Sequence, residues 1–168
     1  MFSRNLSRSI QRSSIYNSKR QFSLTDWFKS WQNAAQTQRL IYPPSPTQFT
    51  TNNRIIDVWV DQKQDLYNYI NVKPPLLLNF TTATPENNKI TQELFDLLVD
   101  KSKYPGKEPV YLVNILADSQ GGRELMLEYV VNKIPTIVVL KHQLFVGSYS
   151  PNVKNFHEQD LIDFLKDI

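Results

Sequence analysis

The sequence excludes thiol chemistry, because the chain has no cysteine among its 168 residues. A cysteine sulfur is needed for disulfide exchange, for cysteine–zinc sites and for iron–sulfur ligation, so all three are excluded. The two histidines, His142 and His157, are isolated and lack the carboxylate spacing of a metal site. We therefore predict no catalytic residue, no metal ligand and no bound cofactor.

Anion binding is the other chemistry that a short stretch suggests. Gly121 and Gly122 follow Asp118 and stand at the start of a predicted helix, where free backbone N–H groups favour an anion. One glycine pair is neither a P-loop nor a dinucleotide-binding fingerprint, so we interpret it as an ordinary helix start.

The stretch TPENN, residues 84–88, begins the helix with the clearest start signals in the sequence. Thr84 is a good N-cap residue, Pro85 is favoured at the first helical position, and Glu86 suits the positive end of the helix dipole. Apolar residues then recur at helical spacing as far as Leu98. We predict a helix over residues 84–103 whose first turn holds no redox-active group.

The elements around this helix alternate between strands and helices. Continuous apolar or β-branched runs predict strands, and amphipathic stretches between them predict helices. The predicted strands are residues 54–60, 74–80, 109–116, 134–141 and 143–149, with a hairpin at His142–Gln143, and the predicted helices are residues 61–71, 84–103, 120–131 and 157–168. The order β-α-β-α-β-α-β-β-α predicts an α/β domain over residues 54–168, with a central mixed sheet flanked by helices.

This order and two local motifs resemble the thioredoxin-like superfamily. LLLNF (76–80) is similar to the strand before the redox helix of that family. IPTIVVLKHQLFVGSY (134–149) is similar to its cis-proline turn and the hairpin that follows. The resemblance covers about residues 54–168 and implies a thioredoxin-like fold. An N-terminal helical extension is predicted to precede this domain.

Counting from Phe80 along the family pattern shows which redox residues are replaced. Thr84 falls at the flanking aromatic residue, Pro85 at the first cysteine and Asn88 at the second cysteine. Asn79 falls at the buried acid that moves protons for the second thiol. Because disulfide exchange needs a thiolate nucleophile, the resemblance implies a redox-inactive member that lacks the Cys-x-x-Cys motif.

The resemblance also implies a groove beside this unreactive helix start. In the family the cis proline faces the redox helix, and the residue before it can pair its backbone with an extended peptide. Two alternatives stay open: Pro135 is kept only for the shape of its loop, or the groove still binds a peptide without reacting with it. The candidate groove residues are Thr84, Pro85, Asn87, Asn88, Ile134, Pro135 and Thr136.

Residues 1–22 have the composition of a mitochondrial transit peptide. They contain five basic residues, abundant serine and no acid, with arginines recurring every four residues. Without these five of its 19 basic residues, the chain has 14 basic and 16 acidic residues, a net charge of −2. The net charge of the remaining chain therefore does not favour binding to nucleic acid. RQFSL (20–24) predicts cleavage near Gln21–Ser23 and a location in the mitochondrial matrix. The alternative is a basic tail that binds nucleic acid or anionic lipid.

Residues 23–53 combine a predicted amphipathic helix with a proline-rich linker. Trp27, Phe28 and Trp31 form an aromatic stripe within residues 25–40, and YPPSPTQFTTNN (42–53) is typical of a semi-extended linker. The stripe either packs on the protein's own domain or docks on a partner or membrane surface. No apolar run approaches the roughly 20 residues of a transmembrane helix.

These observations predict a non-catalytic mitochondrial protein that acts as an interaction adaptor or assembly factor. Its expected partner is a protein or a multi-subunit mitochondrial complex and not nucleic acid, and peripheral contact with the inner membrane stays open. The alternative is a glutathione-dependent enzyme on a thioredoxin-like scaffold without its own catalytic cysteine. Such enzymes activate glutathione near the first helix turn, where Thr81, Thr82 and Thr84 offer the hydroxyls.

Overall fold

A computed structural model of the chain describes residues 39–168. The predicted transit peptide (1–22), its cleavage position near Gln21–Ser23 and the aromatic stripe lie outside the described residues. The elements are η1 (Pro46–Gln48), β1 (Arg54–Val60), α2 (Lys63–Leu66), β2 (Leu76–Thr81), α3 (Pro85–Val99), β3 (Tyr111–Leu116), α4 (Gln120–Glu128), β4 (Thr136–Lys141), β5 (Leu144–Tyr149), η2 (Val153–Asn155) and α5 (Glu158–Lys166). Apart from the two short 3₁₀ turns, η1 and η2, this is the predicted order, which confirms the α/β fold class.

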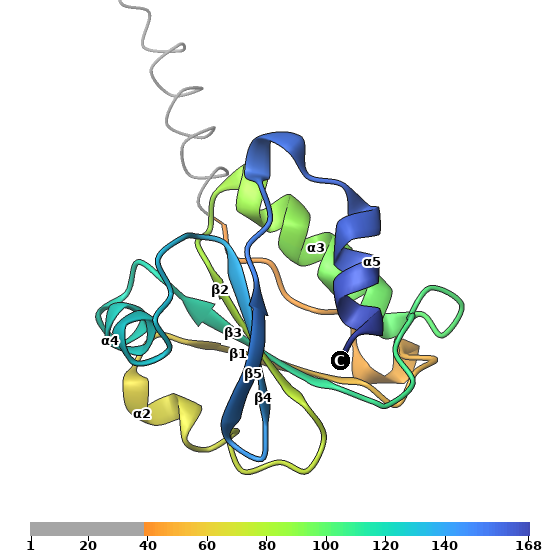
Figure 1. The fold of residues 1–168 in the computed structure, drawn as a ribbon, viewed down its shortest axis with the longest axis horizontal. Helices are drawn as coiled ribbons and strands as arrows, with labels where there is room; N and C mark the ends of the chain where they lie inside the picture. The colour runs from red at the N-terminus through yellow and green to blue at the C-terminus, as the bar shows by residue number, and fades with distance from the viewer. Residues whose placement is uncertain (1–38) are drawn as a thin grey trace, which may run out of the picture.

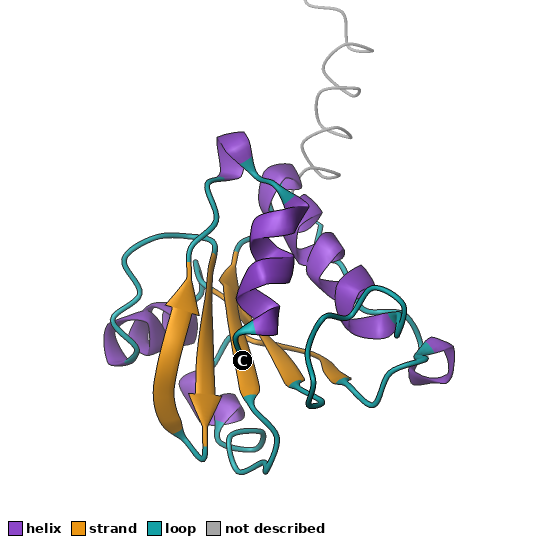
Figure 2. Cartoon of the chain, turned by 45° about the vertical axis from the view of Figure 1, so that its right-hand side comes forward, coloured by secondary structure: helices purple, strands orange, loops and turns teal. Residues whose placement is uncertain are grey.

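The five strands form one mixed sheet in the order β1-β3-β2-β4-β5. β1, β3 and β2 run parallel, because helices connect them, whereas β4 and β5 form the antiparallel hairpin at one edge. Every residue of β2 is buried, which explains why this strand is apolar except at Asn79 and Thr81. Figure 2 shows the twisted sheet with helices on both sides.

The helices form two layers, one on each face of the sheet. α3 and α5 lie on one face, and α2 and α4 lie on the other (Figure 1). Side chains of β4 alternate between the two layers. Ile137 and Val139 join the core under α3 and α5, whereas Val138 and Leu140 join the core on the side of α2 and α4.

The helix predicted over residues 61–71 is much shorter in the structure. Of the predicted residues 61–71, only Lys63–Leu66 form α2. The N–H groups of the next three residues, through Tyr69, bond to carbonyls three residues back instead of four. The chain therefore continues in tighter turns, where the sequence pattern predicted an α-helix.

Two other helices also end before their predicted limits. The helix predicted over 84–103 is α3, which ends because Asp100 adopts an extended backbone. The helix predicted over 120–131 is α4, which ends before Val130 takes a left-handed φ of 55°. α5 begins directly after His157, its N-cap residue. Within residues 39–168, no helix is long and apolar enough to cross a bilayer.

The segment before β1 packs along α3. We name residues 39–53 the strap. Asn88 Nδ2, in the first turns of α3, donates to the carbonyl of Arg39 at 2.8 Å, and the N–H of Thr50 donates to the carbonyl of Val99, the last residue of α3, at 2.9 Å. Phe49 and Ile41 pack against the core under α3 and α5. The linker predicted at 42–53 therefore lies against the domain, behind α3 in Figure 1.

Candidate functional site

The start of α3 and the Ile134–Pro135 turn lie at the same end of the sheet. β2 and β4 are antiparallel neighbours, and Phe80 of β2 pairs with Thr136 of β4. Thr81 ends β2 shortly before α3 begins, and Ile134–Pro135, a cis peptide bond, directly precedes β4. The register therefore brings together the two segments that the sequence predicted to line a groove.

The start of α3 has the predicted sequence signals. Thr84 occupies the N-cap, Pro85 is the first helical residue and Glu86 lies in the first turn. The Thr84 hydroxyl makes no capping hydrogen bond, although the N–H of Asn88 donates to the Thr84 carbonyl at 2.8 Å. Thr84, Pro85 and Glu86 are all exposed, so this helix start presents neutral and acidic groups to solvent.

The two asparagines after Glu86 make internal hydrogen bonds. Asn87 is buried, and its Nδ2 donates to Thr82 Oγ1 at 2.7 Å. Asn88, at the position of the second family cysteine, donates from Nδ2 to the Arg39 carbonyl of the strap. Both side-chain amides therefore bind other parts of this chain. The contact with the strap was not predicted, because Arg39 and Asn88 are 49 residues apart.

The second segment combines buried side chains with backbone groups that make no hydrogen bond within residues 39–168. Pro135 and Thr136 are buried, and Ile134 is half-buried. Thr136 Oγ1 donates to the Lys133 carbonyl at 2.8 Å, so Ser150, at 2.6 Å, donates its own hydroxyl hydrogen to Thr136. The N–H and C=O of Ile134 make no hydrogen bond to any residue within 39–168. In the described part of the chain, Ile134 therefore has one backbone donor and one backbone acceptor without a partner.

A polar cluster lies in the core between β2, β3 and α3. Asn79 is 1% exposed, and its Nδ2 donates to Thr91 Oγ1 at 3.1 Å and to Asn114 Oδ1 at 2.9 Å. These neutral groups replace the buried acid that the family pattern places at Asn79, so no carboxylate is available there to move a proton. Asn79 was singled out from the sequence, whereas Thr91 and Asn114 were not. The signal for Asn114 was an asparagine in the apolar run YLVNIL.

The glycine pair has a packing role in the structure. Both glycines lie inside α4, and Ser119 is the N-cap, accepting from the N–H of Gly122 at 2.9 Å. A Cβ at Gly121 would lie 2.5 Å from the carbonyl oxygen of Asp61, to which the N–H of Gly121 donates at 3.1 Å. Gly121 therefore allows α4 to approach the turn after β1, and this N–H is already satisfied.

The remaining candidates for chemistry are dispersed. His142 lies in the turn between β4 and β5, and His157 occupies the N-cap position of α5 without a capping hydrogen bond from its side chain. Within residues 39–168, no three side chains of His, Asp or Glu cluster as a metal site would require. Thr81 is buried and Thr82 accepts from Asn87, which leaves Thr84 as the exposed hydroxyl of the three named threonines.

Solved structures share this fold at low sequence identity. Thioredoxin O2 from Arabidopsis thaliana in its oxidised state aligns with a TM-score of 0.52 and 15% identity over 70% of this chain and 96% of its own. Thioredoxin from Trypanosoma brucei brucei aligns with a TM-score of 0.51 and 15% identity, over 77% and 94%. Thioredoxin NaTrxh from Nicotiana alata aligns with a TM-score of 0.51 and 14% identity, over 69% and 93%. No protein-family model and no curated protein matches the chain.

At this level of identity the likeness establishes the fold alone. The thioredoxin-like fold predicted from the sequence is confirmed. With no cysteine, the chain has no Cys-x-x-Cys motif and cannot act as a thiol oxidoreductase.

Proposed function

We propose that this chain, a thioredoxin-like fold without thiols, binds an extended segment of a protein partner at the sheet end formed by α3 and Ile134. In this role it is a non-catalytic adaptor or assembly factor. The observation that carries the proposal is that, within residues 39–168, the N–H and C=O of Ile134 are unpaired, at the same end of the sheet as the exposed residues Thr84 and Pro85. A bound strand would satisfy both groups, as in other cases of strand addition.

The proposal requires binding without reaction, and the local chemistry supports this. Pro85 and Asn88 stand where thiols would act, and neither side chain is a nucleophile at neutral pH. Asn88 also makes a hydrogen bond to the Arg39 carbonyl. A partner segment would therefore meet a helix start without a nucleophile and a backbone edge, and both favour reversible binding.

A site-specific photocrosslink tests this function. The photoreactive residue p-benzoylphenylalanine replaces Ile134 in the full chain, which is then illuminated in mitochondrial extract. We expect one discrete adduct with a protein, because a bound segment would lie within reach of this position.

The matched control places the same residue at Val58, a partly exposed valine on β1 at the opposite edge of the sheet. No adduct is expected from position 58. An identical adduct from both positions, or none from position 134, would contradict binding at the proposed end of the sheet.

We also propose that the protein is located in the mitochondrial matrix. The acid-free, arginine-rich residues 1–22 support import into the mitochondrial matrix. Fused to a reporter protein, residues 1–24 are expected to direct import and cleavage near Gln21–Ser23. A reporter that stays outside mitochondria would refute the location.

The aromatic stripe is proposed as a further partner contact. Trp27 and Trp31 offer apolar area of the kind found at interaction surfaces. Replacing both by alanine is expected to lower the yield of the adduct from position 134. An unchanged yield would instead favour a stripe that packs on the protein's own domain.

The glutathione-dependent alternative has less support. Of the three threonine hydroxyls near the start of α3, Thr81 is buried and Thr82 accepts a hydrogen bond from Asn87. Retention of the full chain on glutathione-agarose would support this alternative. In that case, Thr84→Ala is expected to abolish retention.

A further inference from the structure

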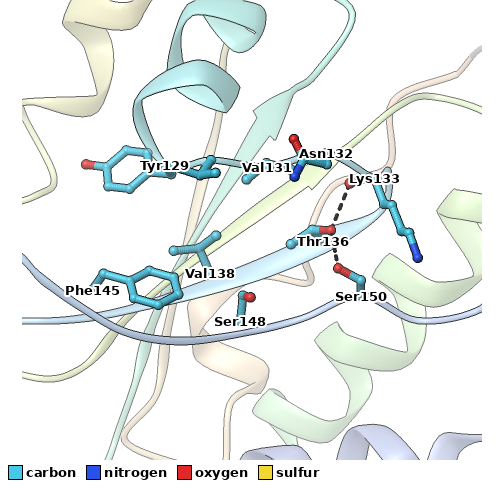
Figure 3. A pocket seen from close by; sticks show the side chains of 10 residues that line it. Tyr129, Val131, Asn132, Lys133, Thr136, Val138, Phe145, Ser148 and Ser150 are labelled. Atoms are coloured by element: carbon cyan, nitrogen blue, oxygen red, sulfur yellow. Dashed lines mark hydrogen bonds between the residues drawn. The ribbon is translucent and has the colours of Figure 1, made fainter.

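A cavity of about 440 Å³ lies beside the proposed peptide site. The loop after α4, residues 129–133, forms one wall, and Phe145, Ser148 and Ser150 form the other (Figure 3). Thr136 and Val138 of β4 line its base. Lys133 and Thr136 also flank Ile134–Pro135 in the chain, so the cavity continues from the proposed site onto the face of the sheet that carries α2 and α4.

The cavity exists because the helices of this face leave the hairpin uncovered. α4 packs over β3, and the short α2 packs over β1. Val138 pairs with Ser148, and Leu140 pairs with Phe145, so Phe145 points to this same face. Phe145 is 58% exposed. An exposed phenylalanine beside a cavity is available for contact with another chain.

Val130, on the rim of the cavity, has an unfavourable backbone conformation. Its φ is 55°, in the left-handed region that β-branched residues avoid. Glycine or asparagine is the usual residue after a helix end of this kind. Val130 is 76% exposed, so its side chain contributes little packing, and the backbone of the helix end holds this conformation: the N–H of Val131 donates to the Met126 carbonyl at 2.8 Å. Strained residues of this kind cluster at binding sites.

The charge of the cavity indicates what the occupant carries. Among residues 39–168, Lys133 is the one charged residue that lines the cavity, and no carboxylate of this part of the chain lines it. Burial raises the pKa of Tyr129, so this hydroxyl stays neutral at pH 7. In Figure 3, Tyr129 and Phe145 lie toward one end, and Lys133 and Ser150 lie toward the other. The cavity therefore has an apolar end and a polar, positively charged end.

We propose that this cavity binds the partner segment through an apolar side chain packed against Val130 and Phe145, followed by a carboxylate beside Lys133. The inference rests on the proposed peptide-binding function and assigns the kind of segment that is bound. Apolar contact supplies affinity at one end, and charge complementarity selects an acidic residue at the other.

Peptide titration of the isotope-labelled full chain, followed by NMR, tests the inference. The probes are three blocked heptapeptides: Gly-Gly-Phe-Gly-Asp-Gly-Gly, its analogue with lysine for aspartate, and its analogue with alanine for phenylalanine. We expect the aspartate peptide to bind about fivefold more tightly than the lysine peptide. The amides of Val130, Phe145 and Ser148 should shift. Equal binding of all three peptides overturns the inference.

Neighbouring residues on β5 provide a matched pair of variants. Phe145 lines the cavity, whereas Val146 is 53% exposed and does not line it. Phe145→Ala is expected to weaken binding of the aspartate peptide about tenfold, and Val146→Ala is expected to leave it unchanged. Lys133→Glu should reverse the preference between the aspartate and lysine peptides. Equal loss in both alanine variants, or an unreversed preference, contradicts the inference.

Val130→Gly separates binding from folding. Glycine tolerates the left-handed φ at this position, so the substitution is expected to raise the melting temperature by about 3–5 °C. Loss of the valine side chain is expected to weaken binding of the aspartate peptide several-fold. A more stable variant with unchanged binding overturns the inference.

The titration also distinguishes the inference from the proposed function. Shifts at Thr84 and Ile134 without shifts at Phe145 and Ser148 refute the cavity and leave the proposed site in place. Absence of any binding also refutes the cavity, and the photocrosslink at position 134 then decides the proposed function independently.

Discussion

Asn79 shows how one buried residue changes the chemistry of this site. Its amide lies within a strand whose residues are all buried, and it holds Thr91 and Asn114 together. An amide donor satisfies both oxygens without carrying charge, so the cluster stabilises the core instead of exchanging protons. The residue itself was evident in the sequence. Its pairing with Thr91 and Asn114 could not be predicted, because these partners come from other elements.

Removing this amide is expected to destabilise the fold. Asn79→Ala takes one donor from two buried acceptors and leaves a small cavity, which should lower the free energy of unfolding by about 2–4 kcal/mol. Urea denaturation measures the change. Asn68→Ala, at an exposed asparagine, should stay within about 0.5 kcal/mol of the unmodified chain. Equal effects of the two substitutions would contradict a structural role for the cluster.

Tyr104 predicts a pH dependence of stability. Its hydroxyl donates to the Glu108 carbonyl at 2.6 Å. Burial, with a smaller contribution from the Glu108 charge, raises its pKa from 10.0 to about 12. Because the folded state favours the protonated phenol, this stabilisation is complete below about pH 10 and is lost as the pH rises toward 12.

Denaturation at about pH 9 and about pH 11.5 tests this dependence, since these values bracket the ordinary tyrosine pKa. Tyr104→Phe should lose less stability over this interval than the unmodified chain, because it has no proton to release. Tyr42→Phe, at an exposed tyrosine, is the control. A Tyr104→Phe slope equal to that of the unmodified chain would show that another group is responsible.

At the scale of elements, the β4–β5 hairpin combines a predictable pairing with an unusual turn. Its position at His142–Gln143 was predicted from the apolar runs on either side. Both turn residues have positive φ, 51° and 66°, as a two-residue type I′ turn requires. Neither residue is the asparagine or glycine that favours this turn. The tertiary pairing of β5 with β4 therefore holds a turn that local preference disfavours.

Optimising the turn is expected to stabilise the protein. His142→Asn combined with Gln143→Gly should raise the free energy of unfolding by about 1–2 kcal/mol, because both residues then tolerate positive φ. His142→Val should lower it by about 1 kcal/mol, since a β-branched residue avoids this region. Chemical denaturation measures both. No gain from the double substitution would mean that the two side chains make compensating contacts.

At the scale of the whole molecule, the strap is hydrogen-bonded to the predicted domain through Asn53. Asn53 Nδ2 donates to the Leu98 carbonyl near the end of α3 at 2.9 Å, and its Oδ1 accepts from the N–H of Val110 before β3 at 2.9 Å. This residue lies immediately outside the predicted domain of residues 54–168. The strap therefore contributes to the stability of a domain whose boundary was predicted from composition alone.

Truncation measures this contribution. A chain of residues 54–168 loses the Asn53 hydrogen bonds and the packing of Ile41 and Phe49, so it should unfold about 3–5 kcal/mol more easily than residues 39–168. Residues 39–168 with Gln48→Ala, at an exposed strap residue, provide the control. Equal stability of the two truncated chains would show that the strap is dispensable.

Sequence and tertiary structure decided different properties of this protein. The sequence by itself determined the order of elements, the hairpin, the start of α3 at Thr84 and the absence of thiol chemistry, because these follow from composition and local periodicity. Tertiary structure alone decided that Asn88 meets Arg39, 49 residues away, and that Asn79 meets Asn114, 35 residues away. It also decided that Val130 shares a cavity with Phe145. Contacts between distant segments depend on strand register and helix packing, which leave no periodic signal in the chain.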